Sequence, residues 1–201
     1  RAVRRLNPIK PASASLPVVF DPRVSASLIG HLVGAITGSA IARGTSFLKD
    51  RLGTAILPAG LNVIDDPLRP RGLRSRAFDG EGLATARTAL VADGVLTTWL
   101  LDVASAAQLG LAPTGHASRG TSGPPGAATS NLHLEGGTAT PAALIADIAD
   151  GIYVTELIGM GVNGLTGDYS RGASGFRIER GEITHAVAEL TIAGNLIDML
   201  G

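Results

Sequence analysis

The stretch from Thr155 to Phe176, TELIGMGVNGLTGDYSRGASGF, constrains the fold more than any other part of the chain because it is so dense in glycine. Glycine loses more conformational freedom on folding than any other residue. A dense run therefore favours backbone at positive φ, or backbone that another group approaches closely. Asp168, Tyr169, Ser170 and Arg171 stand between these glycines. We interpret the run as a candidate site built on a tight loop between strands.

Three of these glycines also match a nucleotide-binding pattern. Gly159, Gly161 and Gly164 spell GxGxxG after the apolar run IYVTELI, which fits a strand entering a dinucleotide-binding turn. Such a turn must open a long helix, yet more glycines follow at once, and each would cost a helix about 1 kcal/mol. The pattern therefore favours a glycine-rich loop over a dinucleotide site.

The same stretch, continued by IERGEITHAVAELTIAGNLIDM, resembles the C-terminal domain of the TldD/PmbA (TldE) family, on its PmbA/TldE branch. The resemblance implies a role in zinc-dependent peptide degradation, and members of the family were once called modulators of DNA gyrase. It also implies that an N-terminal domain precedes this region and that further strands follow it. We expect residues 1–17, rich in proline, to be a linker from that domain, and residues 18–201 to be the family's C-terminal domain without its last strands.

Charge and composition exclude several classes of protein. The 17 basic and 17 acidic side chains cancel, so no global field attracts nucleic acid, and nucleic-acid binding is not expected. The chain has no cysteine, which excludes disulfides and thiolate metal sites within it. No apolar run is long enough to span a membrane, and we expect a cytoplasmic protein.

The segment from Val24 to Gly44 predicts one helix, buried on most sides, with Gly30, Gly34 and Gly38 allowing close approach of another backbone. In the TldD branch the resembling helix carries HExxxH, which supplies two zinc ligands and a glutamate base. Alignment on the following RGTS segment puts Ile29, Gly30 and Gly34 at those positions. None of them can bind zinc or accept a proton, and His31 has no second ligand four residues away. We therefore expect no metal centre in this chain.

Turn chemistry predicts several other elements. Asp93-Gly94 and Arg180-Gly181 indicate two β-hairpins, and Thr140-Pro141 indicates a helix that continues to Asp150. The last segment, ELTIAGNLIDML, indicates a strand and a turn. Because helices and strands mix irregularly, we expect an α+β fold with largely antiparallel sheets, hairpins and a few packed helices, one of them buried.

Other polar residues receive structural interpretations. We expect a strand that ends at Asp65 and Asp66. Because neighbouring strand residues face opposite ways, the two carboxylates cannot easily share a proton, and we attribute them to turn chemistry. Asp79 and Glu81 have no assigned role. Residues 113–126, with His116, are expected to form an exposed, mobile loop. The arginines of LRPRGLRSR are expected in a solvated loop, with pairing to a peptide carboxylate or a partner subunit as the alternative.

Two hypotheses of function remain. In the first, the chain is a non-catalytic, TldE-like subunit, inactive alone, that helps to bind a peptide substrate while a TldD-like partner supplies zinc. The groove residues would be Thr155, Asp168, Ser170 and Arg171, with the peptide held by strand addition. In the second, the chain is a self-associating binding or regulatory protein, like a gyrase modulator, without peptidase activity. The two hypotheses predict a heterodimer and a homodimer respectively.

Overall fold

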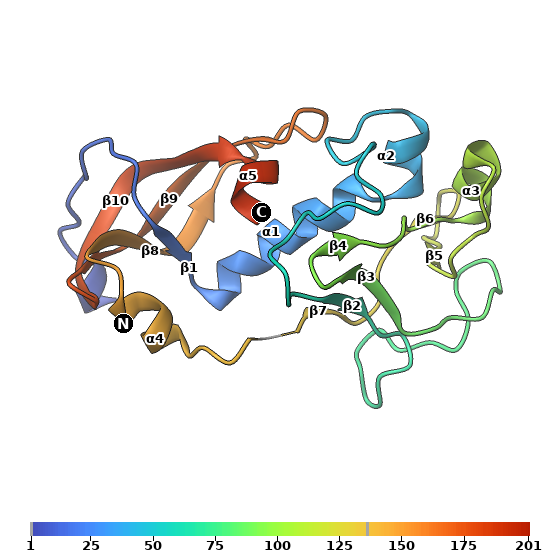
Figure 1. The fold of residues 1–201 in the computed structure, drawn as a ribbon, viewed down its shortest axis with the longest axis horizontal. Helices are drawn as coiled ribbons and strands as arrows, with labels where there is room; N and C mark the ends of the chain where they lie inside the picture. The colour runs from blue at the N-terminus through green and yellow to red at the C-terminus, as the bar shows by residue number, and fades with distance from the viewer. Residues whose placement is uncertain (1, 136) are drawn as a thin grey trace. The chain divides into compact units, whose positions relative to one another are not determined.

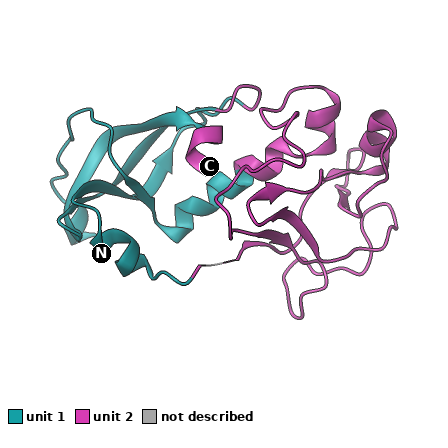
Figure 2. Cartoon of the chain, viewed as in Figure 1, with its two compact units in different colours: residues 1–30, 138–163, 168–195 teal, residues 31–137, 164–167, 196–201 magenta. Residues whose placement is uncertain are grey.

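The computed structural model describes residues 2–135 and 137–201 and confirms the α+β class. The chain divides into two compact units, each assembled from separate stretches of sequence (Figure 2). Unit 1 contains residues 1–30, 138–163 and 168–195, and unit 2 contains residues 31–137, 164–167 and 196–201. No helix in the described part of the chain is long and apolar enough to cross a membrane.

Unit 1 is built on a four-stranded sheet in the order β1-β8-β9-β10 (Figure 1). β1 pairs with β8 in parallel, and the other two pairs are antiparallel. Inward side chains of the sheet form a small aliphatic core around Ile152, Val154 and Val187. The predicted turn at Arg180-Gly181 is confirmed, since both residues have positive φ between β9 and β10. The strands are β1 (Val18–Phe20), β8 (Asp150–Ile158), β9 (Asp168–Glu179) and β10 (Glu182–Asn195).

Residues 3–9 contact the sheet of unit 1. The 3-10 helix η1 (Val3–Arg5) places the guanidinium groups of Arg4 and Arg5 over the Phe176 ring, at 5.3 and 5.9 Å from its centroid. Ile9 then forms a parallel bridge with Val187 of β10. This part of the expected linker therefore contacts β9 and β10.

Helix α4 (Pro141–Ala146) starts as predicted but ends early. Thr140 Oγ1 accepts a hydrogen bond from Ala143 N at 3.1 Å, so the N-cap is confirmed. The expected continuation to Asp150 is wrong, because Asp150 already pairs with Glu179 as the first residue of β8. Sheet pairing therefore prevails over helix propensity at this point.

The single helix expected from Val24 to Gly44 is instead two helices, α1 (Pro22–Ala35) and α2 (Gly38–Ala42). The break occurs where Leu100 N donates to Ile36 O at 2.9 Å and Gly38 N donates to Leu100 O at 2.7 Å. Close approach is found at Gly38, where an added Cβ would meet Ser105, whereas Gly30 and Gly34 face open space in the described structure.

Unit 2 contains a second four-stranded sheet, in the order β4-β3-β2-β7, and a two-stranded pair, β5-β6. The hairpin predicted at Asp93-Gly94 is confirmed, with positive φ at both residues. Helix α3 (Val103–Leu109) ends at Gly110, which has φ 66°. The chain end is a helix, α5 (Leu196–Leu200), where a turn was expected. The strands are β2 (Val63–Asp65), β3 (Thr88–Ala92), β4 (Val95–Leu96), β5 (Ala117–Ser118), β6 (Gly126–Ala127) and β7 (Leu132–Leu134).

Candidate functional site

The glycine-rich run forms the end of β8, a connecting loop and the start of β9 (Figure 1). The loop has positive φ at Gly159 and Gly167. At Gly161 an added Cβ would collide with the carbonyl oxygen of Ser170, whose own N–H donates to Gly161 O at 2.6 Å. No helix follows the GxGxxG pattern, which confirms the loop interpretation. Gly161 therefore allows the backbone of the loop to approach the backbone of β9 at Ser170 closely.

The four predicted groove residues do not form one cluster. Asp168 and Ser170 are exposed and share one face of β9, because side chains alternate along a strand. Arg171 lies on the opposite face with Tyr169, which is 1% exposed. Thr155 lies farther along the sheet, at a bulge in β8, where its Oγ1 accepts a hydrogen bond from Arg5 Nη2 at 2.8 Å. A peptide contact at any of these residues stays a prediction.

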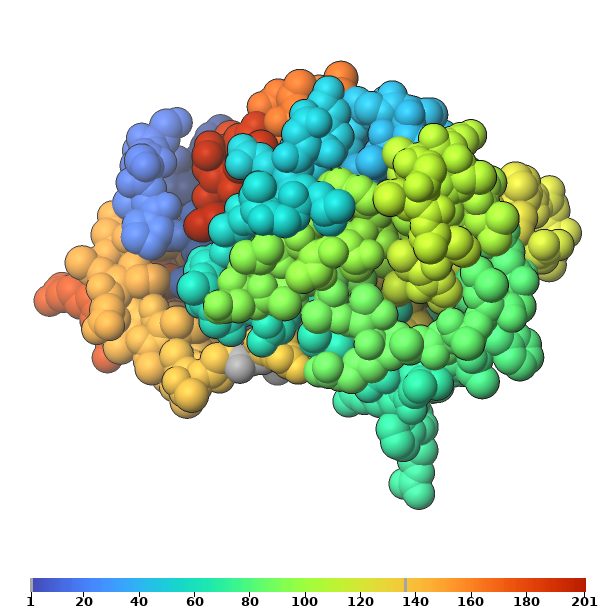
Figure 3. Space-filling model, turned by 45° about the vertical axis from the view of Figure 1, so that its right-hand side comes forward, coloured from blue at the N-terminus to red at the C-terminus, as the bar shows by residue number. Residues whose placement is uncertain are grey.

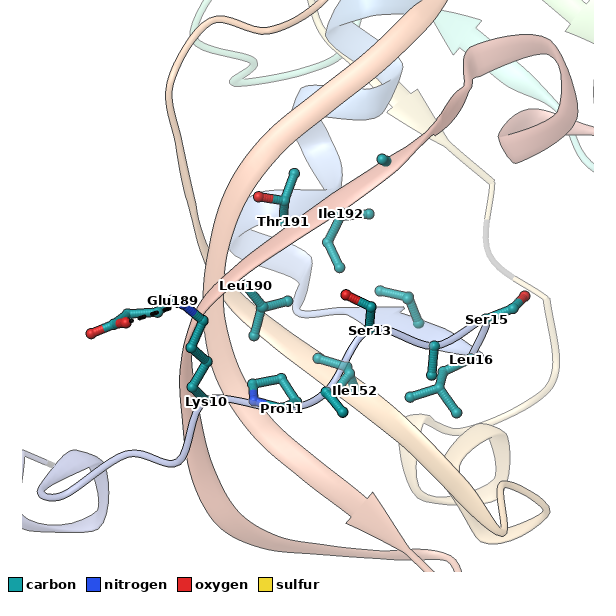
Figure 4. Close-up of a pocket in the computed structure, with 14 residues that line it drawn as sticks. Lys10, Pro11, Ser13, Ser15, Leu16, Ile152, Glu189, Leu190, Thr191 and Ile192 are labelled. Atoms are coloured by element: carbon teal, nitrogen blue, oxygen red, sulfur yellow. Dashed lines mark ion pairs between the residues drawn. The ribbon is translucent and has the colours of Figure 1, made fainter.

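A hollow in unit 1 lies elsewhere, between the segment 10–18 and β10 (Figure 4). It has a volume of about 410 Å³, and the Lys10 ammonium lies 3.7 Å from the Glu189 carboxylate beside it. Leu16, Ile152 and Leu190 contribute apolar lining. None of the four predicted groove residues is among its lining residues.

The side chains on helix α1 determine whether this helix could supply ligands to a catalytic metal. Ile29, Gly30 and Gly34 lie on this helix, and none offers a nitrogen, sulfur or oxygen donor from its side chain. A catalytic zinc site needs three protein ligands. Within residues 2–135 and 137–201 no three His, Cys, Asp or Glu side chains form a group that could hold a metal ion. The described residues therefore do not fit a zinc site.

Unit 2 contains a buried polar cluster that the sequence patterns did not reveal. Asp65, His116 and Ser130 are 1%, 3% and 8% exposed. Asp65 Oδ1 accepts hydrogen bonds from Ser130 N at 2.8 Å and Ser130 Oγ at 2.9 Å, and its Oδ2 lies 3.5 Å from His116 Nε2. His116 Nδ1 lies 2.9 Å from Thr114 Oγ1. The cluster joins β2 to the segments that precede β5 and β7.

These positions correct two interpretations. His116 was expected in an exposed, mobile loop, yet it is buried, and β5 and β6 pair beside it. The Asp65 carboxylate was attributed to turn chemistry, yet it is buried and accepts hydrogen bonds from Ser130, at the end of the expected strand, which is β2. The turn role is confirmed for Asp66, whose Oδ1 accepts a hydrogen bond from Leu68 N at 3.1 Å.

The two acids without an assigned role hold backbone in place. Asp79 is buried and accepts hydrogen bonds from the N–H groups of Glu81, Leu83 and Ala117. These bonds outweigh burial and lower the pKa of Asp79 below its ordinary value. Glu81 Oε2 accepts from Val103 N at 2.8 Å, at the start of α3. Both acids therefore have structural roles.

Burial lowers the pKa of His116 below its ordinary value, although the Asp65 carboxylate opposes the shift. The unfolded chain therefore binds more protons than the folded chain as the pH falls through about 6.5, and folding loses stability there. We expect the melting temperature to fall between about pH 7 and pH 5, and to fall less steeply in His116→Asn. Thermal melts across this pH range measure the slope for each variant. His185→Asn, at an exposed histidine, is the control. An unchanged slope in His116→Asn would contradict the assignment.

The comparisons with known proteins agree with this architecture. The model of the PmbA/TldA metallopeptidase C-terminal domain matches residues 13–201. The chain belongs to the PmbA/TldD family.

Relatives within the PmbA/TldD family confirm the predicted PmbA/TldE branch. The chain is 44% identical to Metalloprotease PmbA of Escherichia coli O157:H7, over 99% of the chain and 42% of that protein. It resembles the solved structure of a proposed modulator of DNA gyrase from Bacteroides thetaiotaomicron, with a TM-score of 0.89 and 34% identity over 98% of the chain and 43% of that structure. The structure of TldE from Thermococcus kodakarensis gives a TM-score of 0.87 and 27% identity, over 96% of the chain and 45% of that structure. The chain thus spans less than half the length of these relatives.

Proposed function

We propose that the chain is a non-catalytic, TldE-like part of a zinc-dependent peptidase of the TldD/TldE type, and that a TldD-like partner supplies the metal. The observation that carries the proposal is on α1, where the residues that the sequence resemblance aligns with the HExxxH ligands and base are Ile29, Gly30 and Gly34. Aliphatic and hydrogen side chains can neither bind zinc nor accept a proton from water. The similarity to PmbA and TldE supports the choice of family and branch.

The role of this chain would then be to shape the surface that binds the peptide. The exposed face of β9 offers Asp168 and Ser170, while Thr155 and Arg171 remain candidates at separate places on the same sheet. In the described sheet of unit 1, β1 and β10 are the edge strands, and Ile9 already pairs with β10 at Val187. An extended peptide can add to such an edge through backbone hydrogen bonds.

Reconstitution tests the proposal. The chain alone is expected to hold only substoichiometric zinc and to cleave no peptide, whereas a mixture with a TldD-type protein carrying HExxxH is expected to cleave peptides in a chelator-sensitive reaction. Elemental analysis and a fluorogenic peptide assay measure the two properties. A mixture containing a Glu→Gln variant of HExxxH is the control and should be inactive. Metal-dependent cleavage by the purified chain alone would overturn the proposal.

The second candidate is a self-associating regulatory protein without peptidase activity. The solved relatives described as modulators of DNA gyrase are what favours it. Light scattering on the same samples separates the two candidates. A stable homodimer that neither binds the HExxxH protein nor increases its activity would favour the regulatory role.

A further inference from the structure

A positively charged recess opens in unit 2 between the loop of residues 66–76 and the segment 129–132 that leads into β7. Its volume is about 570 Å³. The loop projects from the surface of unit 2 as a blue-green finger at the lower edge of Figure 3. The recess is lined by Arg69, Pro70, Arg71, Gly72, Leu73, Arg74, Thr129, Ser130, Asn131 and Leu132.

The loop that carries the arginines is held in one shape by Asn131. The Asn131 side chain donates to Asp66 O at 2.8 Å and to Ser75 Oγ at 2.9 Å, and it accepts from Arg74 N at 3.1 Å. Ser75 Oγ donates in turn to Arg69 O at 2.6 Å. An added Cβ at Gly72 would collide with the Asn131 amide. The backbone beneath the arginines is therefore organised before any ligand binds, which lowers the entropic cost of binding.

The floor of the recess is equally well anchored. Ser130 is 8% exposed, and both its N–H and its hydroxyl donate to the buried Asp65. Ser130 thus connects the recess to the buried polar cluster of unit 2, which fixes the position of this part of the lining.

No ion pair among the described residues balances the arginines of the recess. Arg69, Arg71 and Arg74 are exposed, no acidic side chain lines the recess, and within the described chain none of the three forms an ion pair. The nearest acid in sequence, Asp66, forms no ion pair with these arginines among the described residues; its Oδ1 accepts a hydrogen bond from Leu68 N. Because the whole chain has no net charge, this local excess of positive charge is specific to the loop. Guanidinium groups bind carboxylates through paired hydrogen bonds.

We propose that this recess binds a peptide carboxylate, either a C-terminus or an acidic side chain. Leu68 and Leu73 on the same loop are 55% and 103% exposed, and they offer apolar contact beside the charge, as a peptide side chain requires. The recess has no aromatic lining residue on which a nucleic-acid base would stack. The identification of the ligand as a peptide rests on the proposed function. The charge and shape of the recess are observed independently of that function.

Fluorescence anisotropy with three labelled peptides of leucine and serine tests the proposal on the chain alone. One peptide has a free C-terminal carboxylate, one has a C-terminal amide, and one has the amide and an internal glutamate. We expect the first or the third to bind at least about tenfold more tightly than the neutral amide, and less tightly as salt increases. The first identifies a C-terminus as the source of the carboxylate, and the third identifies a side chain.

Matched variants distinguish binding at the recess from non-specific electrostatic binding. Replacing Arg69, Arg71 and Arg74 together by glutamine should weaken carboxylate binding about tenfold or more, whereas Arg51→Gln, an exposed arginine elsewhere in unit 2, should leave it unchanged. Replacing the three arginines by lysine keeps the charge and should restore part of the affinity. Circular dichroism confirms that each variant is folded.

Equal binding of all three peptides, no binding of any, or full binding by the triple glutamine variant would overturn the proposal. Arginine-dependent binding of inorganic phosphate without binding of the peptides would also overturn it. The assay needs neither metal nor partner, so its failure would leave the reconstitution test of the proposed function unaffected.

Discussion

Replacing Asp65 with alanine is expected to lower the free energy of unfolding by about 3–5 kcal/mol. The substitution removes the acceptor for Ser130 N and Ser130 Oγ and the carboxylate beside His116, and all three residues are almost fully buried. Buried donors without acceptors cost about 1–3 kcal/mol each. Chemical denaturation followed by circular dichroism measures the loss.

Asp66→Ala is the matched control for this prediction. The neighbouring carboxylate accepts one hydrogen bond in an exposed turn, from Leu68 N, so its removal should cost less than about 1 kcal/mol. Asp65→Asn keeps an acceptor oxygen and should fall between the two. If Asp65→Ala and Asp66→Ala had equal effects, the buried cluster would not be a stabilising feature of unit 2.

The substitution Gly175→Ala is expected to destabilise unit 1 by about 3 kcal/mol. Gly175 lies in β9, opposite Val154 of β8, and an added Cβ would collide with the carbonyl oxygen of Tyr153. A backbone oxygen within a paired strand cannot rotate away as a side chain can, so the strands themselves must separate. Urea denaturation and the yield of folded protein measure the effect.

Gly172→Ala provides the control within the same strand. Its added Cβ would lie 3.6 Å from Ile158, an ordinary van der Waals contact, and its φ is not in the left-handed region. Stability should stay the same or rise slightly, because alanine loses less conformational freedom than glycine. Similar losses for the two variants would show that the close approach at Gly175 is not what matters.

Elements whose signals lie within a few residues of each other were predictable from sequence. The turns at Asp93-Gly94 and Arg180-Gly181 and the cap at Thr140 depend on local backbone chemistry, and the structure confirms them. The errors occur where a distant strand decides the outcome. Leu100 interrupts the helix expected from Val24 to Gly44, and Glu179 draws Asp150 into β8. Local pattern contains no information about such partners.

The candidate sites show the same division. The lack of zinc donors at Ile29, Gly30 and Gly34 is a local property, and the sequence showed it directly. The buried cluster joins Asp65 to Ser130, which lies 65 residues later. His116 lies in a segment of Gly, Pro, Ser and Thr, a composition typical of exposed loops. Only tertiary structure brings these polar groups together.

The division of the chain into interleaved stretches has a consequence for the order in which the protein forms. Most of unit 2 is one continuous segment, residues 31–137, so a ribosome delivers it in a single piece. β1 is synthesised before that segment but pairs with β8, which is synthesised after it. The three apolar residues of β1, Val18–Phe20, are therefore synthesised long before β8 and cannot pair until β8 has been made. We therefore expect the β1–β8 pair of unit 1 to form late, because it requires the closure of a long loop.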